Sequence, residues 1–294
     1  MRIIHTPSLA DLTTLRLGGR AVALVCPESD EDLARLYETL SQLGGTPFML
    51  GRGSNLLASD GKLDVTLVRL STDTTPAVLG RDENGLVRIR VNAGCALPRL
   101  LAWCAARGLS GLEGLAGIPG EVGGALRMNA GSYGTSFTDR VIGVELLSPR
   151  TGRQCISRDA LHAAYRHTTL PEDGPDTLIL GVELALTTST RESVLTAMRQ
   201  HLRQKAATQP IRARSAGCTF ANPVGLSAGK LLDELGFKGK RIGGMAFSTM
   251  HANFLINTGN GTSEEAMELI EQARNAAWQE RHIQLHLEVK LLPC

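Results

Sequence analysis

Several features that would assign a protein to a specialised class are missing from this sequence. Its six cysteines form no C-x-x-C pair and do not cluster with histidine, so neither a zinc site nor a disulfide framework is indicated. No apolar run approaches the roughly 20 residues of a membrane span, and the first residues contain no continuous apolar stretch typical of a secretion signal. We therefore expect a cytosolic protein with no membrane partner and no bound metal.

Neither sign of charge dominates the chain. It carries 31 basic and 29 acidic residues, for a formal net charge of +2. This balance argues against a nucleic-acid or other polyanionic partner, so any phosphate binding must be local. With 294 residues, of which 43% are hydrophobic, the chain is long enough for two or three domains.

The two best-known phosphate-binding motifs are also absent. The stretch Gly51-Arg52-Gly53 lacks the third glycine of a dinucleotide fingerprint, and no Walker A lysine follows a glycine loop. What the chain does contain is a block of eight glycines within residues 111–134, and a shorter glycine loop at 51–55 that follows a predicted strand. Glycine lets backbone approach a ligand closely, and consecutive N–H groups in turns form anion sites. Two such loops suit a diphosphate, although glycines that only make tight turns would give the same pattern.

Hydrophobic periodicity predicts a mixed α+β fold. We expect a helix over 29–45 capped by Ser29 or Asp30, and a second capped at Thr262, where Glu265 completes a capping box. The last segment, 283–292, alternates as a strand with Ile283, Leu285, Leu287, Val289 and Leu291 on one face. The other expected strands are 20–27, 47–50, 65–70, 86–94 and 177–186, together with a hairpin over 141–157. The other expected helices are 97–108, 191–207 and 227–236.

Seven short motifs follow one another in an order that resembles the UDP-N-acetylenolpyruvoylglucosamine reductases. The block at 111–134 and "GGMAFSTMHANFLIN" at 243–257, which contains HANF-x-x-N, are the most specific of them. The others are "TTLRLGG" at 13–19, "LGRGSNLL" at 50–57, "YR" at 165–166, "SAGCTFANP" at 215–223 and "LEVKLL" at 287–292. The resemblance implies a two-domain FAD-binding region of the vanillyl-alcohol-oxidase type plus a third, substrate-binding α+β domain. We place these at 1–70, 71–187 and 188–294, with the strand 283–292 returning to the flavin site.

The resemblance also implies an activity. Members of the family use non-covalent FAD and the co-substrate NADPH to reduce the enolpyruvyl ether of UDP-N-acetylglucosamine to UDP-N-acetylmuramate, a peptidoglycan precursor. Hydride passes from flavin N5 to the β-carbon, and a proton then reaches the α-carbon. By this resemblance Arg166 and Glu288 stabilise the enolate and Cys218 gives the proton. The implied partners are small molecules only, and the implied oligomeric state is a monomer.

The remaining site residues are carried over motif by motif. The resemblance assigns Tyr165, Asn222, His251 and Asn253 to substrate binding. It assigns the following residues to FAD binding: Gly51, Arg52, Gly53, Ser54, Asn55, Gly117, Ile118, Pro119, Gly120, Gly123, Gly124, Asn129, Ala130 and Gly131.

The chain departs from the family pattern at several positions. Cys218 stands where most members have serine, and a thiol, with a free pKa of about 8.5, is a far stronger acid than a hydroxyl. Ala221 replaces a common lysine, and Thr13 replaces an asparagine. Glu121 stands where a small hydroxyl residue is usual, and a carboxylate facing a diphosphate would be repelled unless it turned outward. Few residues separate Arg166 from the next strand, which indicates the shorter subclass without the tyrosine-bearing loop.

Two other functions remain open from the sequence. One is a flavin oxidoreductase of the same fold acting on a different sugar or alcohol. The other is a non-catalytic FAD-binding protein, against which the combination of Arg166, Cys218 and Glu288 argues. A substrate-dependent oxidation of NADPH separates these alternatives from the reductase.

Overall fold

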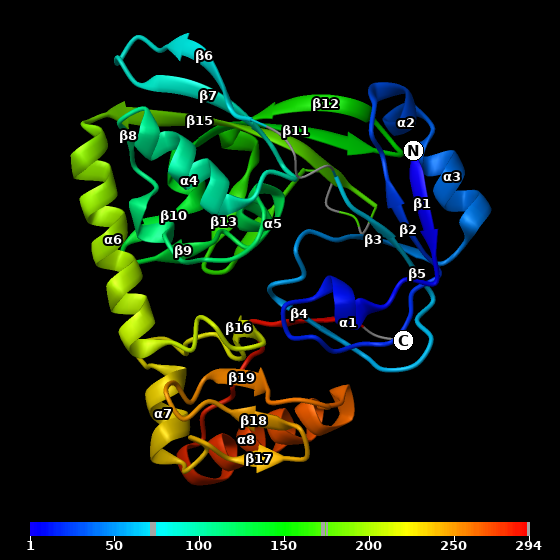
Figure 1. The fold of residues 1–294 in the computed structure, drawn as a ribbon, viewed down its shortest axis with the longest axis vertical. Helices are drawn as coiled ribbons and strands as arrows, with labels where there is room; N and C mark the ends of the chain where they lie inside the picture. Colours follow the sequence, from blue (N-terminus) through cyan, green and yellow to red (C-terminus); the bar gives the residue numbers. More distant parts are fainter. Residues whose placement is uncertain (71–74, 172–173, 175, 293–294) are drawn as a thin grey trace. The chain divides into compact units, whose positions relative to one another are not determined.

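The computed structural model describes residues 1–70, 75–171, 174 and 176–292 (Figure 1). The chain forms two compact units. Unit 1 comprises Met1–Ile3, Leu24–Gly51 and Thr66–Lys205, and unit 2 comprises Ile4–Ala23, Arg52–Val65 and Ala206–Cys294. Because the chain enters each unit more than once, residues distant in sequence meet within each. The division at 1–70, 71–187 and 188–294 stays a prediction.

The larger sheet of unit 1 is antiparallel. Its order is β12 (Gly152–Ser157), β11 (Val141–Ser148), β15 (Leu178–Thr188), β7 (Val87–Asn92) and β6 (Ala77–Arg81), and β8 (Leu109–Ser110) pairs with the end of β15. Alternate residues Val87, Ile89 and Val91 face a core that α4 (Leu97–Ala106) and α5 (Val122–Arg127) cover. The predicted hairpin over 141–157, the strand at 177–186 and the helix at 97–108 are confirmed.

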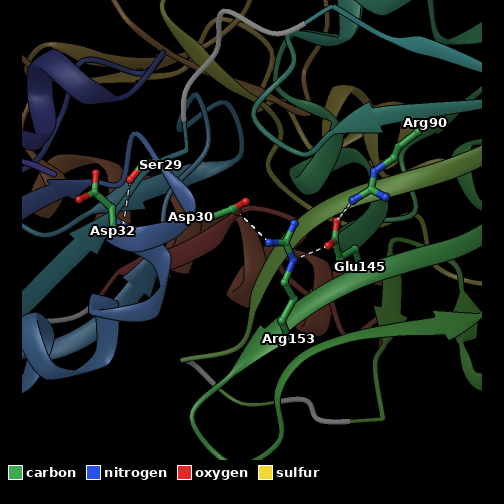
Figure 2. Close-up of polar contacts among 6 residues, drawn as sticks. All are labelled: Ser29, Asp30, Asp32, Arg90, Glu145 and Arg153. Atoms are coloured by element: carbon green, nitrogen blue, oxygen red, sulfur yellow. Dashed lines mark hydrogen bonds and ion pairs between the residues drawn. The ribbon is translucent and has the colours of Figure 1, made fainter.

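A charged network lies on the same sheet (Figure 2). Glu145 of β11 accepts from Arg90 of β7 and from Nε of Arg153 of β12, the latter at 2.6 Å. Nη1 of Arg153 lies 2.7 Å from Oδ1 of Asp30 at the start of α2 (Asp30–Ala34). The carboxylate of Glu145, and then that of Asp30, raises the pKa of Arg153. The network joins helix α2 to the sheet, although partly exposed ion pairs of this kind contribute little each.

A second sheet, most of whose residues belong to unit 1, has the order β1 (Arg2–His5), β2 (Ala23–Cys26), β5 (Val65–Val68) and β3 (Thr46–Met49). The helix predicted over 29–45 is two helices, α2 and α3 (Leu36–Leu43), which meet at Arg35. Burial explains the break, because α3 buries Leu36 and Leu40 whereas α2 buries no residue. The predicted Ser29 cap and the glycine stop are confirmed, since Ser29 Oγ accepts from the N–H of Asp32 and α3 ends at Gly44.

Unit 2 contains a four-stranded antiparallel sheet ordered β16 (Ser215–Cys218), β19 (Phe254–Asn257), β18 (Met245–Phe247) and β17 (Arg241–Ile242). Helix α8 (Ser263–Arg281) packs on it through Ala266, Leu269 and Ile270. The capping box of Thr262 and Glu265 is confirmed, as are the helices predicted at 191–207 and 227–236, which are α6 (Arg191–Thr208) and α7 (Ala228–Glu234). Among the described helices, none combines the length and hydropathy that crossing a membrane requires.

The strand predicted over 283–292 is wrong in length and in register. Only Lys290–Leu292 form a strand, β20, which pairs in parallel with β4 (Leu56–Ala58) of the same unit. Leu285 and Val289 are buried as expected, but Leu291 is 41% exposed and Leu292 is buried instead. The reason is that Glu288 and Val289 direct their N–H groups to the carbonyl of Thr219, and the chain joins β4 only from Lys290 onward.

Candidate functional site

The glycine-rich block of unit 1 offers several backbone donors. The N–H groups of Val122 and Gly123 are used internally, donating to the carbonyls of Cys95 and Ala93 at 2.9 and 2.8 Å. By contrast, no acceptor within the described residues takes the N–H of Gly117, Gly120 or Gly124. Groups of this kind are what an anionic ligand binds at a glycine loop.

Three glycines in this block differ in the space around them. A Cβ on Gly117, whose φ is +81°, would lie 3.0 Å from Leu202 and 3.2 Å from Lys205. A Cβ on Gly123 would lie 3.1 Å from the Cβ of Ala93, whereas one on Gly124 would meet nothing within 4 Å. Gly123 therefore serves packing, and the exposed Gly117 and Gly124 leave room for a ligand. Ile118 packs partly against the core of unit 1, and Pro119 is exposed.

Gly51 and Glu121 lie together in unit 1. The carboxylate Oε2 of Glu121 is 3.2 Å from the position of a Cβ on Gly51, and Nη2 of Arg69 donates to the carbonyl of Gly51 at 2.7 Å. Glu121 is 7% exposed. The carboxylate of Glu121 therefore does not turn outward, and it faces the Gly51 loop from the position before α5.

Arg166 is held by the segment that follows α5. It lies in the turn between β13 (His162–Ala164) and β14 (His167–Thr169), with a left-handed φ of +59°. Its Nη1 donates to the carbonyl of Gly131 at 2.8 Å, and its guanidinium lies 5.0 Å from the ring of the exposed Tyr165. Asn129, next to Ala130, donates to the carbonyl of Ala164 at 3.0 Å and accepts from Thr138. The predicted residues 129–131, 165 and 166 therefore form one connected group within unit 1.

In unit 2 Gly53 lies against residues 12–14. Gly53 has a φ of +64°, and a Cβ there would lie 2.6 Å from the carbonyl oxygen of Leu12. The hydroxyl of Thr14 donates to the carbonyl of Ser215 at 2.7 Å, while its N–H donates to that of Gly53 at 3.3 Å. Thr14 thus connects the glycine loop to β16. Sequence reasoning gave it no role, since only its place in a recognised motif distinguished it.

Asn55, Cys218 and Glu288 come together in unit 2. The side-chain amide of Asn55 donates to the carbonyl of Glu288 at 3.1 Å, and the carbonyl of Asn55 accepts from Lys290 at 3.0 Å. The N–H of Glu288 donates at 2.9 Å to the carbonyl of Thr219, the residue after Cys218. Three segments that are far apart in sequence are therefore joined by backbone bonds. Arg52 is exposed, and Ser54 and Cys218 are partly buried.

The backbone around Cys218 is unusual for a strand. Gly217 has a φ of +79°, and the pairing of β16 with β19 shifts register between Ser215 and Cys218. Such an irregularity re-aims the side chains that follow it. The five cysteines of the described residues, Cys218 included, form no disulfide with one another.

The predicted substrate-binding residues of unit 2 differ in how much of each side chain is available. Asn253 is 2% exposed, and both ends of its amide bond to the backbone of Phe220, at 2.9 and 2.7 Å. Asn222 is exposed and its Oδ1 accepts from Ala228. His251 is half-buried, and burial, followed by the charge of Lys238, lowers its pKa. Because its Nδ1 accepts from the N–H of Asn253 at 3.3 Å, the neutral ring carries its proton on Nε2.

Comparison with known proteins assigns two parts of the chain to known domains. Residues 21–156 match an FAD binding domain, and residues 209–292 match the C-terminal domain of UDP-N-acetylenolpyruvoylglucosamine reductase. A reductase of this name from Nitratidesulfovibrio vulgaris is 48% identical over 99% of both chains. The chain belongs to the UDP-N-acetylenolpyruvoylglucosamine reductase family. It is therefore an FAD-dependent oxidoreductase of peptidoglycan-precursor synthesis.

Other members support the same assignment. The reductase from Oleidesulfovibrio alaskensis is 46% identical, covering 99% of this chain and 98% of its own. The crystal structure of the reductase from Thermus caldophilus superposes with a TM-score of 0.84 at 36% identity, over the whole of both chains. The predicted fold of a reductase, an FAD-binding region followed by a further α+β domain, is confirmed.

The residues of unit 1 fit the FAD that the family requires. Exposed glycines, the N–H groups of Gly117, Gly120 and Gly124 without internal acceptors, and the nearby Arg166 suit an anionic, planar cofactor. The buried carboxylate of Glu121 lies beside Gly51 and would repel a diphosphate bound there. The N–H groups of the 117–124 stretch are therefore better suited than the Gly51 loop to bind the diphosphate.

Proposed function

We propose that this reductase uses NADPH to reduce the enolpyruvyl ether of UDP-N-acetylglucosamine to UDP-N-acetylmuramate. The names of its relatives and the matched C-terminal domain support this substrate. The resemblance further supports a monomer that works in the cytoplasm on small molecules. When bound, FAD supplies the hydride that the β-carbon of the substrate receives.

The observation that carries the proposal is the meeting of a thiol segment and an acid segment. The N–H of Glu288 bonds to the carbonyl of Thr219, next to Cys218, and Asn55 holds the carbonyl of Glu288. These bonds keep the segment that contains Cys218 next to the segment that contains Glu288, which supports pairing the two side chains in one reaction. Reduction of an enol ether beside a carboxylate needs such a pair, one group to stabilise the developing enolate and one to protonate it.

Each catalytic residue has a physical role in this proposal. Cys218 Sγ gives its proton to the α-carbon of the substrate, and the free thiolate regains a proton from water. Arg166, whose Nη1 rests on the Gly131 carbonyl, supplies fixed positive charge to the enolate. Glu288, as a carboxylic acid, donates a hydrogen bond to the same charge. Charge stabilisation of this kind contributes most where water is excluded.

The neighbouring residues divide into two groups by their contacts. We propose that Tyr165, Asn222 and His251 touch the substrate, because each has exposed or half-buried polar atoms. Asn253 and Asn129 act through the backbone, since their amides bond to Phe220 and to Ala164. Truncating either is therefore expected to misplace a catalytic loop.

A steady-state assay tests the proposal. Purified protein loaded with FAD should oxidise NADPH only when the enolpyruvyl sugar nucleotide is present, and UDP-N-acetylglucosamine should not replace it. NADPH oxidation that is indifferent to the enolpyruvyl group, or that is elicited by an unrelated alcohol, would contradict the proposed substrate.

A further inference from the structure

Lys205 is a buried cation at the end of α6 that the proposed mechanism does not use. Its side chain is 3% exposed, and Nζ donates to the carbonyl of Ala116 at 2.7 Å. Ala116 directly precedes Gly117, the first glycine of the stretch proposed to hold FAD. Lys205, the last residue of unit 1, therefore contacts the loop that is proposed to hold FAD.

Aromatic and aliphatic groups enclose this ammonium. Nζ lies 5.5 Å from the ring centre of Tyr133, and that ring stacks on His201, one turn back along α6, at 4.8 Å. A Cβ on Gly117 would lie 3.2 Å from Cδ of Lys205. The lysine is therefore packed against both glycine-rich loops, the one at 116–117 and the one at 131–134.

No carboxylate among the described residues forms an ion pair with Lys205. The acceptor of its Nζ, the carbonyl of Ala116, is a neutral group. Burial, and then the positive charge of Arg166, lowers its pKa to about 8. Lys205 and Arg166 are therefore close enough for their charges to interact. Each donates a hydrogen bond to a carbonyl of the glycine-rich block, that of Ala116 and that of Gly131 respectively. A buried ammonium next to a second cation is unfavourable unless an anion offsets its charge.

We propose that Lys205 is an anion-binding residue that, together with Arg166, holds one oxyanion of a bound ligand. The inference rests on the proposed function, which supplies three sources of that chemistry. These are the diphosphate of FAD, the phosphates of NADPH, and the carboxylate or diphosphate of the sugar nucleotide. All present a negatively charged oxygen to a lysine and an arginine.

A purely structural role predicts different behaviour. In that case the lysine only fastens α6 to the carbonyl of Ala116, with some help from the negative end of the helix. Lys205→Gln keeps an N–H donor but removes the charge, Lys205→Met removes both, and Lys205→Arg keeps both. If Lys205 only fastens the helix, Lys205→Gln should bind ligands as the wild type does. If Lys205 binds an anion, only Lys205→Arg should do so.

The test compares these three variants as FAD-loaded enzymes with the wild type. Arg203→Met is the matched control, because Arg203 is an exposed cation on the same helix. The measurements are the dissociation constant for FAD and the KM values for NADPH and for the sugar nucleotide. We expect Gln and Met to raise one of these constants at least about tenfold, Arg to restore it to within about threefold, and the control to match wild type. The constant that moves identifies the source of the oxyanion.

A second measurement does not depend on activity. Inorganic diphosphate added to the full-length protein should raise the melting temperature of the wild type and of Lys205→Arg, but not of Lys205→Gln. A wild type that binds diphosphate in this way but does not turn over would reject the proposed substrate and leave the anion site supported. Ligand constants of Lys205→Gln and Lys205→Met within twofold of wild type would overturn the anion site, as would an equal loss of stability in all three variants without a change in any ligand constant.

Discussion

At the scale of single residues, the least expected feature is the thiol at position 218. It follows Gly217 in a left-handed conformation and precedes Thr219, whose carbonyl holds the acid segment. The sequence reveals the cysteine and its glycine, but the backbone bond to Glu288 depends on a pairing between distant segments. A thiol in this position is acidic enough to act without a strong neighbouring base.

Replacing Cys218 by alanine should abolish turnover while leaving the first half of the reaction intact. We expect turnover to fall at least about 100-fold, because general-acid groups contribute at that level. NADPH should still bleach the flavin at a near-normal rate, since the thiol serves only the substrate. Cys218→Ser should keep substantial activity, and Cys155→Ala, at an exposed cysteine, should behave as wild type. Normal turnover by Cys218→Ala, followed in a stopped-flow spectrometer, would reject the assignment.

Lys205 gives a prediction on pH and stability. Its pKa is about 8 in the folded protein against 10.5 ordinarily, so between these values the unfolded chain holds a proton that the folded chain has lost. Its contribution to stability therefore rises with pH across this window and is least favourable below pH 8. Relative to wild type, ligand-free Lys205→Met should become less stable by about 1 kcal/mol or more as pH goes from 7 to 10.5. Urea unfolding at several pH values measures this, and a difference that does not vary with pH would contradict it.

Side-chain partners mark the limit of sequence reasoning at this scale. Asn129 and Asn253 are recognisable from their motifs. The side-chain amides of both nevertheless donate to backbone carbonyls, those of Ala164 and Phe220 respectively. Glu121 is recognisable as a departure, but its burial beside Gly51 depends on how α5 packs. Residue type indicates which chemistry is present, whereas the packing decides which atoms are available for it.

At the scale of elements, helices with strong capping signals were predictable and the last strand was not. Thr262 and Glu265 cap the start of α8 by bonds between near neighbours in sequence. The alternation over 283–292 is equally clear in sequence, but Thr219 captures Glu288 and Val289 before the chain reaches β4. The periodicity of one segment cannot show that two distant segments, the one at Thr219 and β4, compete to pair with it. Periodicity also misses the break at Arg35, where α3 buries Leu36 and Leu40 whereas Leu33 of α2 is only partly buried against the same core.

The loop at 51–55 provides a test at this scale. Gly53→Ala would add a methyl group 2.6 Å from the carbonyl oxygen of Leu12, whereas Gly44→Ala, at a similar φ of +73°, meets nothing within 4 Å. We expect Gly44→Ala to cost about 1 kcal/mol from backbone strain alone. Gly53→Ala should cost at least about 2 kcal/mol more, because the overlap is with backbone. Urea unfolding measures both, and equal losses would show that the loop relaxes freely.

At the scale of the whole molecule, the order of motifs carried more information than any single motif. It predicted the family, the FAD-binding region and the α+β class, which the relatives and the solved reductase structure confirm. Within units the structure adds what order cannot: Asn55, Cys218 and Glu288 meet in unit 2, and Asn129, Arg166 and Lys205 gather around the glycine loops of unit 1. Lys205 could not be found from sequence, because a lysine in a helix is usually solvated.

The central claim is that this protein reduces an enolpyruvyl ether, and an anaerobic single turnover tests it most directly. Protein loaded with FAD is bleached with one equivalent of NADPH and then mixed with the enolpyruvyl sugar nucleotide. The account predicts rapid return of the yellow colour and one equivalent of UDP-N-acetylmuramate per flavin, with no return when UDP-N-acetylglucosamine is used. Flavin that stays bleached in the presence of the unsaturated sugar nucleotide would contradict it.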